Sequence, residues 1–179
     1  MVTQKVVLVD KNDNKIGTME KLEAHKKGLL HRAFSVCIFN TKGEMLLQRR
    51  AKHKYHSGGL WTNTCCSHPR PKETVIGAAS RRLKEEMGIL CALKEIGYLV
   101  YKAPFKNGIT EYEYDHVLIG FYDKDPVLNP EEADNFKWET SKNLKKDIQK
   151  NPDAYTFWFK KLVSDFPTLS KKPHKIRAA

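Results

Sequence analysis

Short runs of apolar residues, alternating with polar ones, recur through the first two thirds of the chain. This pattern is typical of β-strands that bury one face. Five runs rich in β-branched or aromatic residues predict strands at 6–9, 33–39, 45–49, 96–101 and 114–121. The residues Asn-Thr-Lys-Gly at 40–43 have the chemistry of a turn and predict a hairpin between two of these strands.

Three later segments predict helices. The first, at 73–87, has a charged face, is followed by Gly88 as a stop signal, and repeats apolar residues at helical spacing: Ile76, Ala79, Leu83 and Met87. A second helix is expected to begin near residue 140 or 141. A third, from about 153 to 166, has Pro152 suited to its first turn and Pro167 as its end. Its broad apolar face consists of Tyr155, Trp158, Phe159, Leu162 and Phe166. This order predicts an α+β fold, an α/β/α sandwich with a mixed sheet.

The length and composition indicate a soluble globular protein. A chain of 179 residues, 40% hydrophobic and 30% charged, suits one domain, expected at 1–166. The basic segment 167–179 is expected to be a mobile tail without a function of its own. No apolar run approaches the roughly 20 residues that span a bilayer, and the amino terminus lacks the layout of a signal peptide. We therefore predict a cytoplasmic protein.

The formal net charge of +11 favours anionic partners. Phosphates of small metabolites, nucleic acid and a membrane surface all satisfy it, so charge alone does not choose among them. The cysteines are Cys37, Cys65, Cys66 and Cys91. The adjacent pair cannot easily join in an unstrained disulfide, and the spacing is not that of a zinc ribbon. Free thiols in a reducing compartment are expected.

Candidate proton-transfer chemistry lies in the run Trp-Thr-Asn-Thr-Cys-Cys-Ser-His-Pro at 61–69. In an extended backbone, Cys66 and His68 share one face, and Cys65 points the other way into the core. A nearby cation lowers the pKa of a thiol and makes thiolate accessible near neutral pH. Cys66 beside a metal-bound His68 is therefore a candidate proton donor or acceptor.

Further candidate metal ligands lie elsewhere in the chain. His25 and His31 add two imidazoles, and alternation in the run Thr-Glu-Tyr-Glu-Tyr-Asp at 110–115 turns Glu111 and Glu113 to one side of a strand. With His68, these residues make a shell of three histidines and two carboxylates. Such a shell suits Zn²⁺, Mn²⁺ or Fe²⁺ better than Ca²⁺.

The helical segment resembles the Nudix box, in which a loop and helix place carboxylates beside Mg²⁺ ions that bridge a diphosphate. The matching positions are Glu73, Arg81, Leu83, Glu85, Glu86, Gly88 and Ile89. Two positions depart from the box: Ser67 replaces its first glycine, and Arg82 replaces a metal-binding glutamate. A cation at this position weakens a hydrolytic metal cluster but still attracts a diphosphate, which argues against a nucleotide pyrophosphohydrolase. A solvated helix with favourable ion pairs is the simpler alternative.

Taken together, these motifs resemble the type I isopentenyl diphosphate isomerases, a divergent branch of the Nudix fold, over about 6–166. The run at 61–69 and the Glu-Tyr-Glu at 111–113 are the most specific; the runs beginning at Glu20, His31 and Gln48 support them. The resemblance implies a Nudix-type sandwich. It also implies interconversion of isopentenyl and dimethylallyl diphosphate, with a proton added on one face of the alkene and removed from the other.

The resemblance further implies a role for each site residue. Cys66 and Glu113 would transfer the protons, Tyr101 would assist the glutamate, and the indole of Trp158 would stabilise the carbocation. A first divalent ion, Mn, Zn or Mg, would be held by His25, His31, His68, Glu111 and Glu113. Glu86 would help to bind a second ion, Mg²⁺, together with the diphosphate. The residues expected to grip the diphosphate are Lys21, Arg50, Lys54 and Arg82.

Two other functions compete with this hypothesis. One is a Nudix hydrolase of a nucleoside diphosphate derivative, and the other is a basic RNA-binding module, which only the net charge suggests.

Gly58 replaces a proline that is common in the family, which leaves the geometry of its loop open. The predicted partner is a small prenyl diphosphate, with no nucleic acid and no membrane span, bound by a monomer or homodimer.

Overall fold

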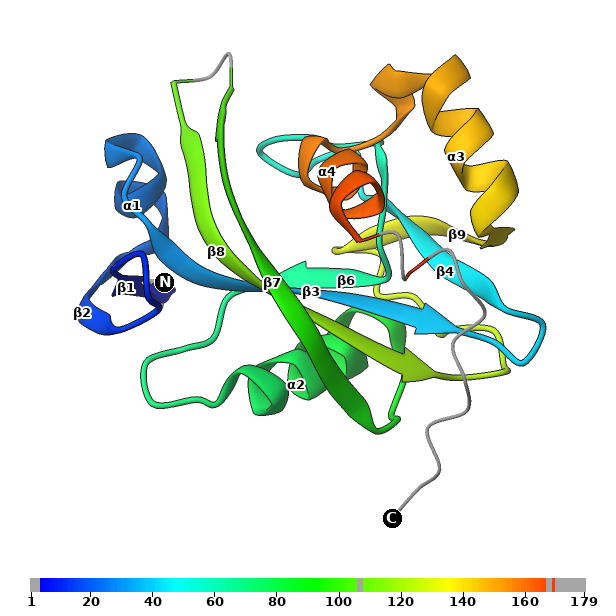
Figure 1. Ribbon diagram of the computed structural model, residues 1–179, viewed down its shortest axis with the longest axis horizontal. Coiled ribbons are helices and arrows are strands. Elements are labelled where there is room, and N and C mark those ends of the chain that lie inside the picture. Colours follow the sequence, from blue (N-terminus) through cyan, green and yellow to red (C-terminus); the bar gives the residue numbers. More distant parts are fainter. Residues whose placement is uncertain (1–3, 106–107, 167–168, 170–179) are drawn as a thin grey trace.

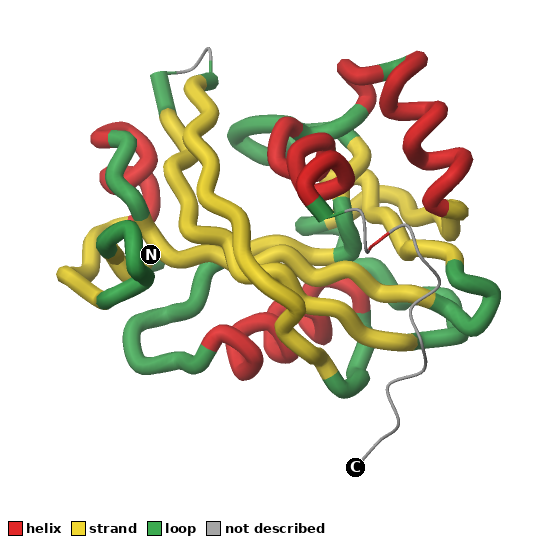
Figure 2. Tube along the Cα trace, viewed as in Figure 1, coloured by secondary structure: helices red, strands yellow, loops and turns green. Residues whose placement is uncertain are grey.

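A branched mixed sheet organises the computed structural model, which describes residues 4–105, 108–166 and 169. The helix α2 (Val75–Met87) covers one face of the sheet, and α3 (Ser141–Lys150) and α4 (Phe157–Asp165) lie on the other (Figure 1). Figure 2 shows the strands as a yellow layer between red helices. The predicted α/β/α sandwich with a mixed sheet is therefore confirmed.

The central strand β3 (His31–Phe39) organises this sheet. It pairs in parallel with β8 (Thr110–Phe121) along its whole length, and antiparallel with β6 (Cys65–Ser67). The long strand β7 (Leu93–Pro104) then pairs antiparallel with β8. Nearly every residue of β3 is buried, as expected for a strand covered on both faces.

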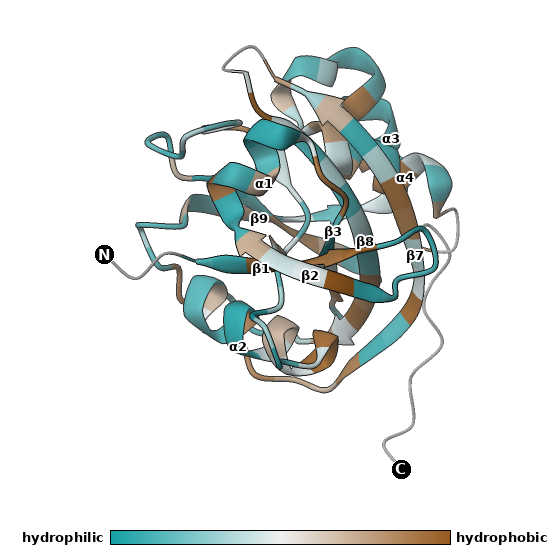
Figure 3. Cartoon of the chain, turned by 90° about the vertical axis from the view of Figure 1, so that its left-hand side faces the viewer, coloured by the Kyte–Doolittle hydropathy of each residue, from teal (hydrophilic) through white to brown (hydrophobic). Residues whose placement is uncertain are grey.

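The remaining strands extend the sheet at its margins. β4 (Glu44–Arg50) pairs with β9 (Ala133–Thr140) and with the short β5 (Trp61–Thr62). β1 (Lys5–Val9) pairs with β2 (Lys15–Glu20), which leads into the short helix α1 (Lys21–Lys27). All five predicted strands are present, although β2, β5, β6, β9 and α1 were not predicted. β2 is largely polar and has exposed or half-buried side chains, so it lacks the alternation that marks a buried strand. In β9, only Ala133 is fully buried, and the apolar residues Phe136 and Trp138 are half-buried against the core. In Figure 3, α1 and α3 are largely teal and present a hydrophilic surface.

The helix α2 has most of the features predicted for the segment 73–87. Thr74 caps its amino terminus, where its Oγ1 accepts a hydrogen bond from Gly77 N–H at 3.1 Å. Gly88 follows its last turn with a left-handed φ of 66°, as the stop signal predicted. Ile76 differs from the prediction, because it is 46% exposed. The buried stripe begins at Ala78, about half a turn later.

The predicted third helix is wrong in extent, because it is interrupted near its start. A 3₁₀ turn, η1 (Pro152–Ala154), precedes two extended residues, and α4 begins only at Phe157. Tyr155 forms a β-bridge with Trp61, and Thr156 N–H donates to Trp61 O at 3.0 Å. Pairing with β5 therefore overrides the helical spacing of the apolar residues at this point.

The rest of the predicted carboxyl-terminal region is described only in part. Trp158, Phe159 and Leu162 of α4 pack into the core, and the helix ends at Asp165. Pro167 and, apart from Leu169, the predicted basic tail lie outside the described residues. In the part of the chain that the structure describes, no helix is both long and apolar enough to cross a membrane.

Candidate active site

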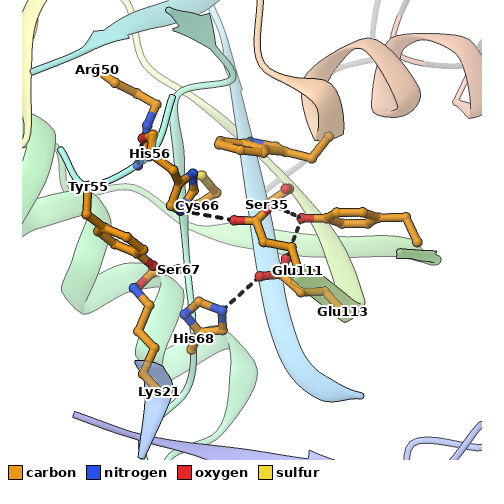
Figure 4. Close-up of a pocket in the computed structure, with 12 residues that line it drawn as sticks. Lys21, Ser35, Arg50, Tyr55, His56, Cys66, Ser67, His68, Glu111 and Glu113 are labelled. Atoms are coloured by element: carbon orange, nitrogen blue, oxygen red, sulfur yellow. Dashed lines mark hydrogen bonds and ion pairs between the residues drawn. The ribbon is translucent and has the colours of Figure 1, made fainter. Parts of the chain in front are cut away.

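A pocket on the α4 side of the sheet brings together most of the residues singled out in the sequence (Figure 4). Eight of the predicted site residues line it: Lys21, Arg50, Cys66, His68, Tyr101, Glu111, Glu113 and Trp158. The pocket is partly open to solvent, and its free volume of about 50 Å³ is enough for a few water molecules.

Strand pairing fixes the acidic side of the pocket. Glu111 and Glu113 lie two residues apart on β8, so both face the pocket, as predicted. Glu113 is paired with His31 on β3 and with Tyr101 on β7. The Tyr101 hydroxyl donates to Glu113 Oε2 at 2.7 Å and approaches Glu111 Oε2 at 3.3 Å. The pairing of β7 with β8 thus places one phenol between two carboxyl groups.

Four buried ligand atoms converge beside these acids. They belong to His25 on α1, His31 on β3, His68 after β6, and Glu113 on β8, and all lie within 4.8 Å of one another. His31 Nε2 is 3.2 Å from the Nε2 atoms of both His25 and His68. His68 Nε2 is 2.9 Å from Glu113 Oε1. Ligands about 2.0–2.1 Å from one ion lie roughly 3.0–3.4 Å apart, so this spacing fits a single divalent cation.

Hydrogen bonding and burial prepare the imidazoles for this role. His31 Nδ1–H donates to Leu29 O at 2.8 Å, which leaves the Nε2 lone pair facing the cluster. Burial, together with the neighbouring imidazoles, lowers the pKa of His25 to about 2. Burial also lowers the pKa of His68 to about 4, although its hydrogen bond with Glu113 acts in the opposite direction. Neutral rings have the lone pairs that a metal requires.

The two glutamates have opposite pKa shifts. Burial would raise the pKa of Glu113, but its contacts with His31 and His68 outweigh it and hold the pKa well below its usual value. Burial and the negative charge of Glu113 raise the pKa of Glu111 well above its usual value. The two close carboxyl groups therefore differ: their surroundings favour the ionised form of Glu113 and the protonated form of Glu111.

Glu111 lies outside the group of four ligand atoms, although it was predicted as a metal ligand. Its Oε1 instead lies 3.3 Å from His56 Nε2 (Figure 4). The sequence interpretation missed His56, as well as Tyr55, whose hydroxyl lies 3.2 Å from His25 Nδ1. The only available signal was an aromatic and an imidazole directly before Ser-Gly-Gly in a loop. The sequence interpretation also missed Ser35, whose hydroxyl donates to the buried Asp115 Oδ2 at 2.8 Å.

Cys66 lies on the other side of β3 from Glu113, because β6 and β8 flank that strand. Its side chain lines the pocket, whereas Cys65 is fully buried against the α2 side, as predicted. Burial raises the pKa of the Cys66 thiol, and the opposing effect of Arg50 is too small to reverse this. The pocket by itself therefore holds a neutral thiol, which differs from the thiolate expected beside a cation.

Two predicted diphosphate ligands line the pocket. Lys21 and Arg50 both contribute side chains to it. The Arg50 guanidinium carbon lies 5.3 Å from the centre of the Trp158 ring, within cation–π range. Among the described residues, Arg50 Nε has no hydrogen-bond partner. A buried, unpaired guanidinium donor is suited to an anionic ligand.

The other two form a separate group beside the Nudix-like helix. Arg82 is 2.7 Å from Glu86 and 2.8 Å from Glu132, which is also paired with Lys54. Glu86 is buried and accepts a further hydrogen bond from Gln48 Nε2 at 3.0 Å. None of these residues lines the pocket in the described structure. The predicted diphosphate residues are therefore divided between two sites.

Comparison with known families and structures identifies the class of this fold. The NUDIX domain model matches residues 29–159. A crystal structure of a Deinococcus radiodurans protein superposes with a TM-score of 0.75 at 18% identity, covering 90% of this chain and 98% of the other. The MutT protein of Methanosarcina mazei Go1 gives 0.65 at 21% identity, with 80% and 96% covered. The chain therefore has the Nudix fold.

Sequence similarity narrows the class to one branch. Isopentenyl-diphosphate Delta-isomerase 2 of Photorhabdus laumondii is 52% identical over 159 residues, which are 89% of this chain and 90% of the relative. The protein of the same name in Aromatoleum aromaticum is 53% identical and covers 86% and 81%. The Pectobacterium atrosepticum isopentenyl-diphosphate Delta-isomerase is 47% identical and covers 93% of each chain. This chain belongs to the isopentenyl-diphosphate Delta-isomerase family.

Proposed function

We propose that this protein interconverts isopentenyl diphosphate and dimethylallyl diphosphate, by adding a proton to one face of the alkene and removing a proton from the opposite face. The observation that carries the proposal is the placement of Cys66 and Glu113. They extend from the two strands that flank β3 and face one pocket. The names of relatives about half identical to this chain support the same reaction.

The protonation states of the two residues match the reaction. Isomerisation requires one group that donates a proton and one that accepts a proton. Burial keeps the pKa of Cys66 high, and hydrogen bonds keep the pKa of Glu113 low, which provides one of each. We assign the two proton transfers to these residues, and the hydroxyl of Tyr101 holds the glutamate in place. After a turnover Cys66 is a thiolate and Glu113 is protonated, and exchange with solvent restores them as the thiolate gains a proton and the glutamic acid loses one.

The carbocation formed by protonating the alkene needs a neighbour that does not attack it. Trp158 lines the pocket and is 3% exposed. An indole face attracts positive charge through its quadrupole and is a poor nucleophile. We assign this stabilising role to Trp158.

A divalent cation would be held by His25, His31, His68 and Glu113, and we propose Glu111 as a fifth ligand. The three imidazole nitrogens favour Zn²⁺ or Mn²⁺ over Mg²⁺ in this site. The cation would supply positive charge that stabilises the ionised form of Glu113. The protein itself orients the carboxylate through the phenol and imidazole contacts described above.

For the diphosphate, we propose Lys21 and Arg50 within the pocket, together with Lys54 and Arg82. The last two would have to exchange their contacts with Glu132 for phosphate oxygens. Glu86, which is buried beside Arg82, is the acid proposed to hold Mg²⁺ together with the diphosphate.

Incubation with dimethylallyl diphosphate in deuterated water tests the proposal. Reversible proton transfer should introduce deuterium at carbon, detected by mass spectrometry, without release of phosphate. A Cys66→Ala variant measures the background exchange. Phosphate release without deuterium at carbon would instead establish a hydrolase and overturn the proposal. Salt-sensitive RNA binding without isomerase activity would favour the RNA-binding alternative.

Two further parts of the proposal concern the setting of the enzyme. Cysteines 37, 65, 66 and 91 are free thiols in the structure, and a proton-carrying Cys66 must stay reduced. We therefore propose that the protein resides in the reducing cytoplasm. We also propose that it acts as a monomer or a homodimer. Light scattering of the purified protein distinguishes the two assemblies.

A further inference from the structure

A buried histidine in an exposed loop stands out beside the proposed metal ligands. His56 lies between β4 and β5, where its side chain is only 6% exposed. His53, three residues earlier in the same loop, has a side chain that is 58% exposed and lies 3.5 Å from Glu131. The loop therefore turns one of its two imidazoles inward. Burying a polar ring is costly unless it gains a partner there.

The His56 ring packs between aromatic groups from distant parts of the chain. Its centre lies 5.1 Å from that of Phe105, and 5.9 Å from that of Trp158 in an edge-on arrangement. The guanidinium of Arg50 donates to the backbone carbonyl of His56 at 3.4 Å. These contacts fix both the ring and its backbone in the wall of the pocket.

The polar partner of His56 is Glu111. His56 Nε2 lies 3.3 Å from Glu111 Oε1, while the Tyr101 hydroxyl approaches the other oxygen of the same carboxyl group at 3.3 Å. Each oxygen of Glu111 thus has a polar neighbour, and the residue lies outside the four-ligand group. Since Ser57 Oγ lies 3.3 Å from His56 Nδ1, the ring has a polar neighbour at each nitrogen.

We infer that His56 is a positioning residue of the metal site, which orients the carboxyl group of Glu111 toward the cation held by the three histidines. It acts through Glu111 and touches neither the proposed cation nor the reacting carbons. Its effect should therefore appear first in metal affinity. The inference rests on the proposed cation site with Glu111 as its fifth ligand, and on the proposed isomerase reaction only where activity is the readout.

Three substitutions separate the polar contact from packing. His56→Phe keeps a ring against Trp158 but removes the nitrogen that faces Glu111. His56→Asn and His56→Gln both keep an amide, but only the longer glutamine reaches the position of Nε2. His53→Gln is the matched control in the same loop. The affinity of metal-free protein for Zn²⁺ is measured by competition with a chromogenic chelator, and kcat and KM are measured separately.

Loss of a residue that orients a metal ligand typically weakens affinity by about 10- to 100-fold. We expect at least the lower value for His56→Phe and His56→Asn, with kcat reduced more than KM is raised. His56→Gln and His53→Gln should bind Zn²⁺ nearly as the wild type does. If His56→Phe does not fold, the comparison of asparagine with glutamine still decides the question. Wild-type affinity in His56→Asn would overturn the inference.

A double-mutant cycle with Glu111→Gln tests whether His56 acts through that residue. If it does, adding His56→Asn to Glu111→Gln should cause little further loss of Zn²⁺ affinity. Additive losses would overturn the inference. The two proposals can fail separately. If the cycle shows that His56 and Glu111 are coupled in Zn²⁺ affinity but the protein never incorporates deuterium into the substrate, the isomerase proposal is refuted and the role of His56 stands.

Discussion

Replacing Tyr101 by phenylalanine removes one hydroxyl and leaves the ring in the core. That hydroxyl donates to Glu113 at 2.7 Å, a normal distance for a strong hydrogen bond, and approaches Glu111 at 3.3 Å, which is too long to add much. The substitution therefore tests a single contact. Glu113 keeps its contact with His68 Nε2 at 2.9 Å, so the carboxylate should remain in the pocket with more freedom to rotate.

The size of the effect follows from the charge on Glu113. A hydrogen bond to an ionised group is worth about 1.5–3 kcal/mol. If that contact is fully used in the transition state, its loss lowers kcat by roughly 10- to 150-fold. The missing donor also destabilises the ionised carboxylate and raises the pKa of Glu113. The acid limb of the pH profile of kcat should therefore move to higher pH.

The assay measures kcat and KM from about pH 3 to pH 9 for the wild type and Tyr101→Phe, a range that includes the acid limb set by Glu113, with cooperative unfolding as a check on the fold. Tyr98→Phe is the matched control, because Tyr98 lies on the same strand, is 56% exposed and stacks on Tyr114 away from the pocket. The control should behave as the wild type. A Tyr101→Phe enzyme with kcat within about twofold of the wild type and an unmoved pH profile would refute the role assigned to this hydroxyl.

Other predictions concern the thiol, the metal and the sheet. Cys66→Ala should lower kcat at least about 100-fold with the fold intact, whereas Cys65→Ala should change kcat only slightly. A kcat of Cys66→Ala within about tenfold of the wild type would show that Cys66 does not transfer the proton. Chelation of the metal should abolish turnover and lower the unfolding temperature, with Zn²⁺ or Mn²⁺ restoring both, and full activity of metal-free protein would contradict this. Thr64 Oγ1 accepts from Ile38 N–H at 2.9 Å and donates to Leu46 O at 2.6 Å. Thr64→Val should therefore reduce the free energy of unfolding by about 2–4 kcal/mol in a urea titration, and a loss below about 1 kcal/mol would show that water replaces these partners.

Residues that shared a strand were the most predictable part of the site. The period of two places Glu111 and Glu113 on one face, and the same rule separates Cys65 from Cys66. The alternation of side chains along one strand determines which way these residues point, independently of how the strand packs against other parts of the chain. The convergence of the three histidines was different, because it followed from the family resemblance and not from spacing.

Contacts between distant segments could not be predicted. His56 reaches Glu111 only because the loop after β4 folds against β8. In the same way, Lys54 and Arg82 share Glu132 through the packing of loops around α2. The polar margin strand β2 was missed because exposed side chains carry no hydrophobic period. Tertiary packing, which single-sequence patterns do not encode, determined each of these features.

The four converging ligand atoms come from α1, β3, the segment after β6, and β8. An ion held there would tie together parts of the chain that the unfolded state leaves far apart, so ion binding and folding are thermodynamically linked. At a free ion concentration a hundredfold above the dissociation constant, this linkage adds about 2.7 kcal/mol to the folded state. The supply of one divalent metal would then govern the stability of this protein as well as its rate of turnover.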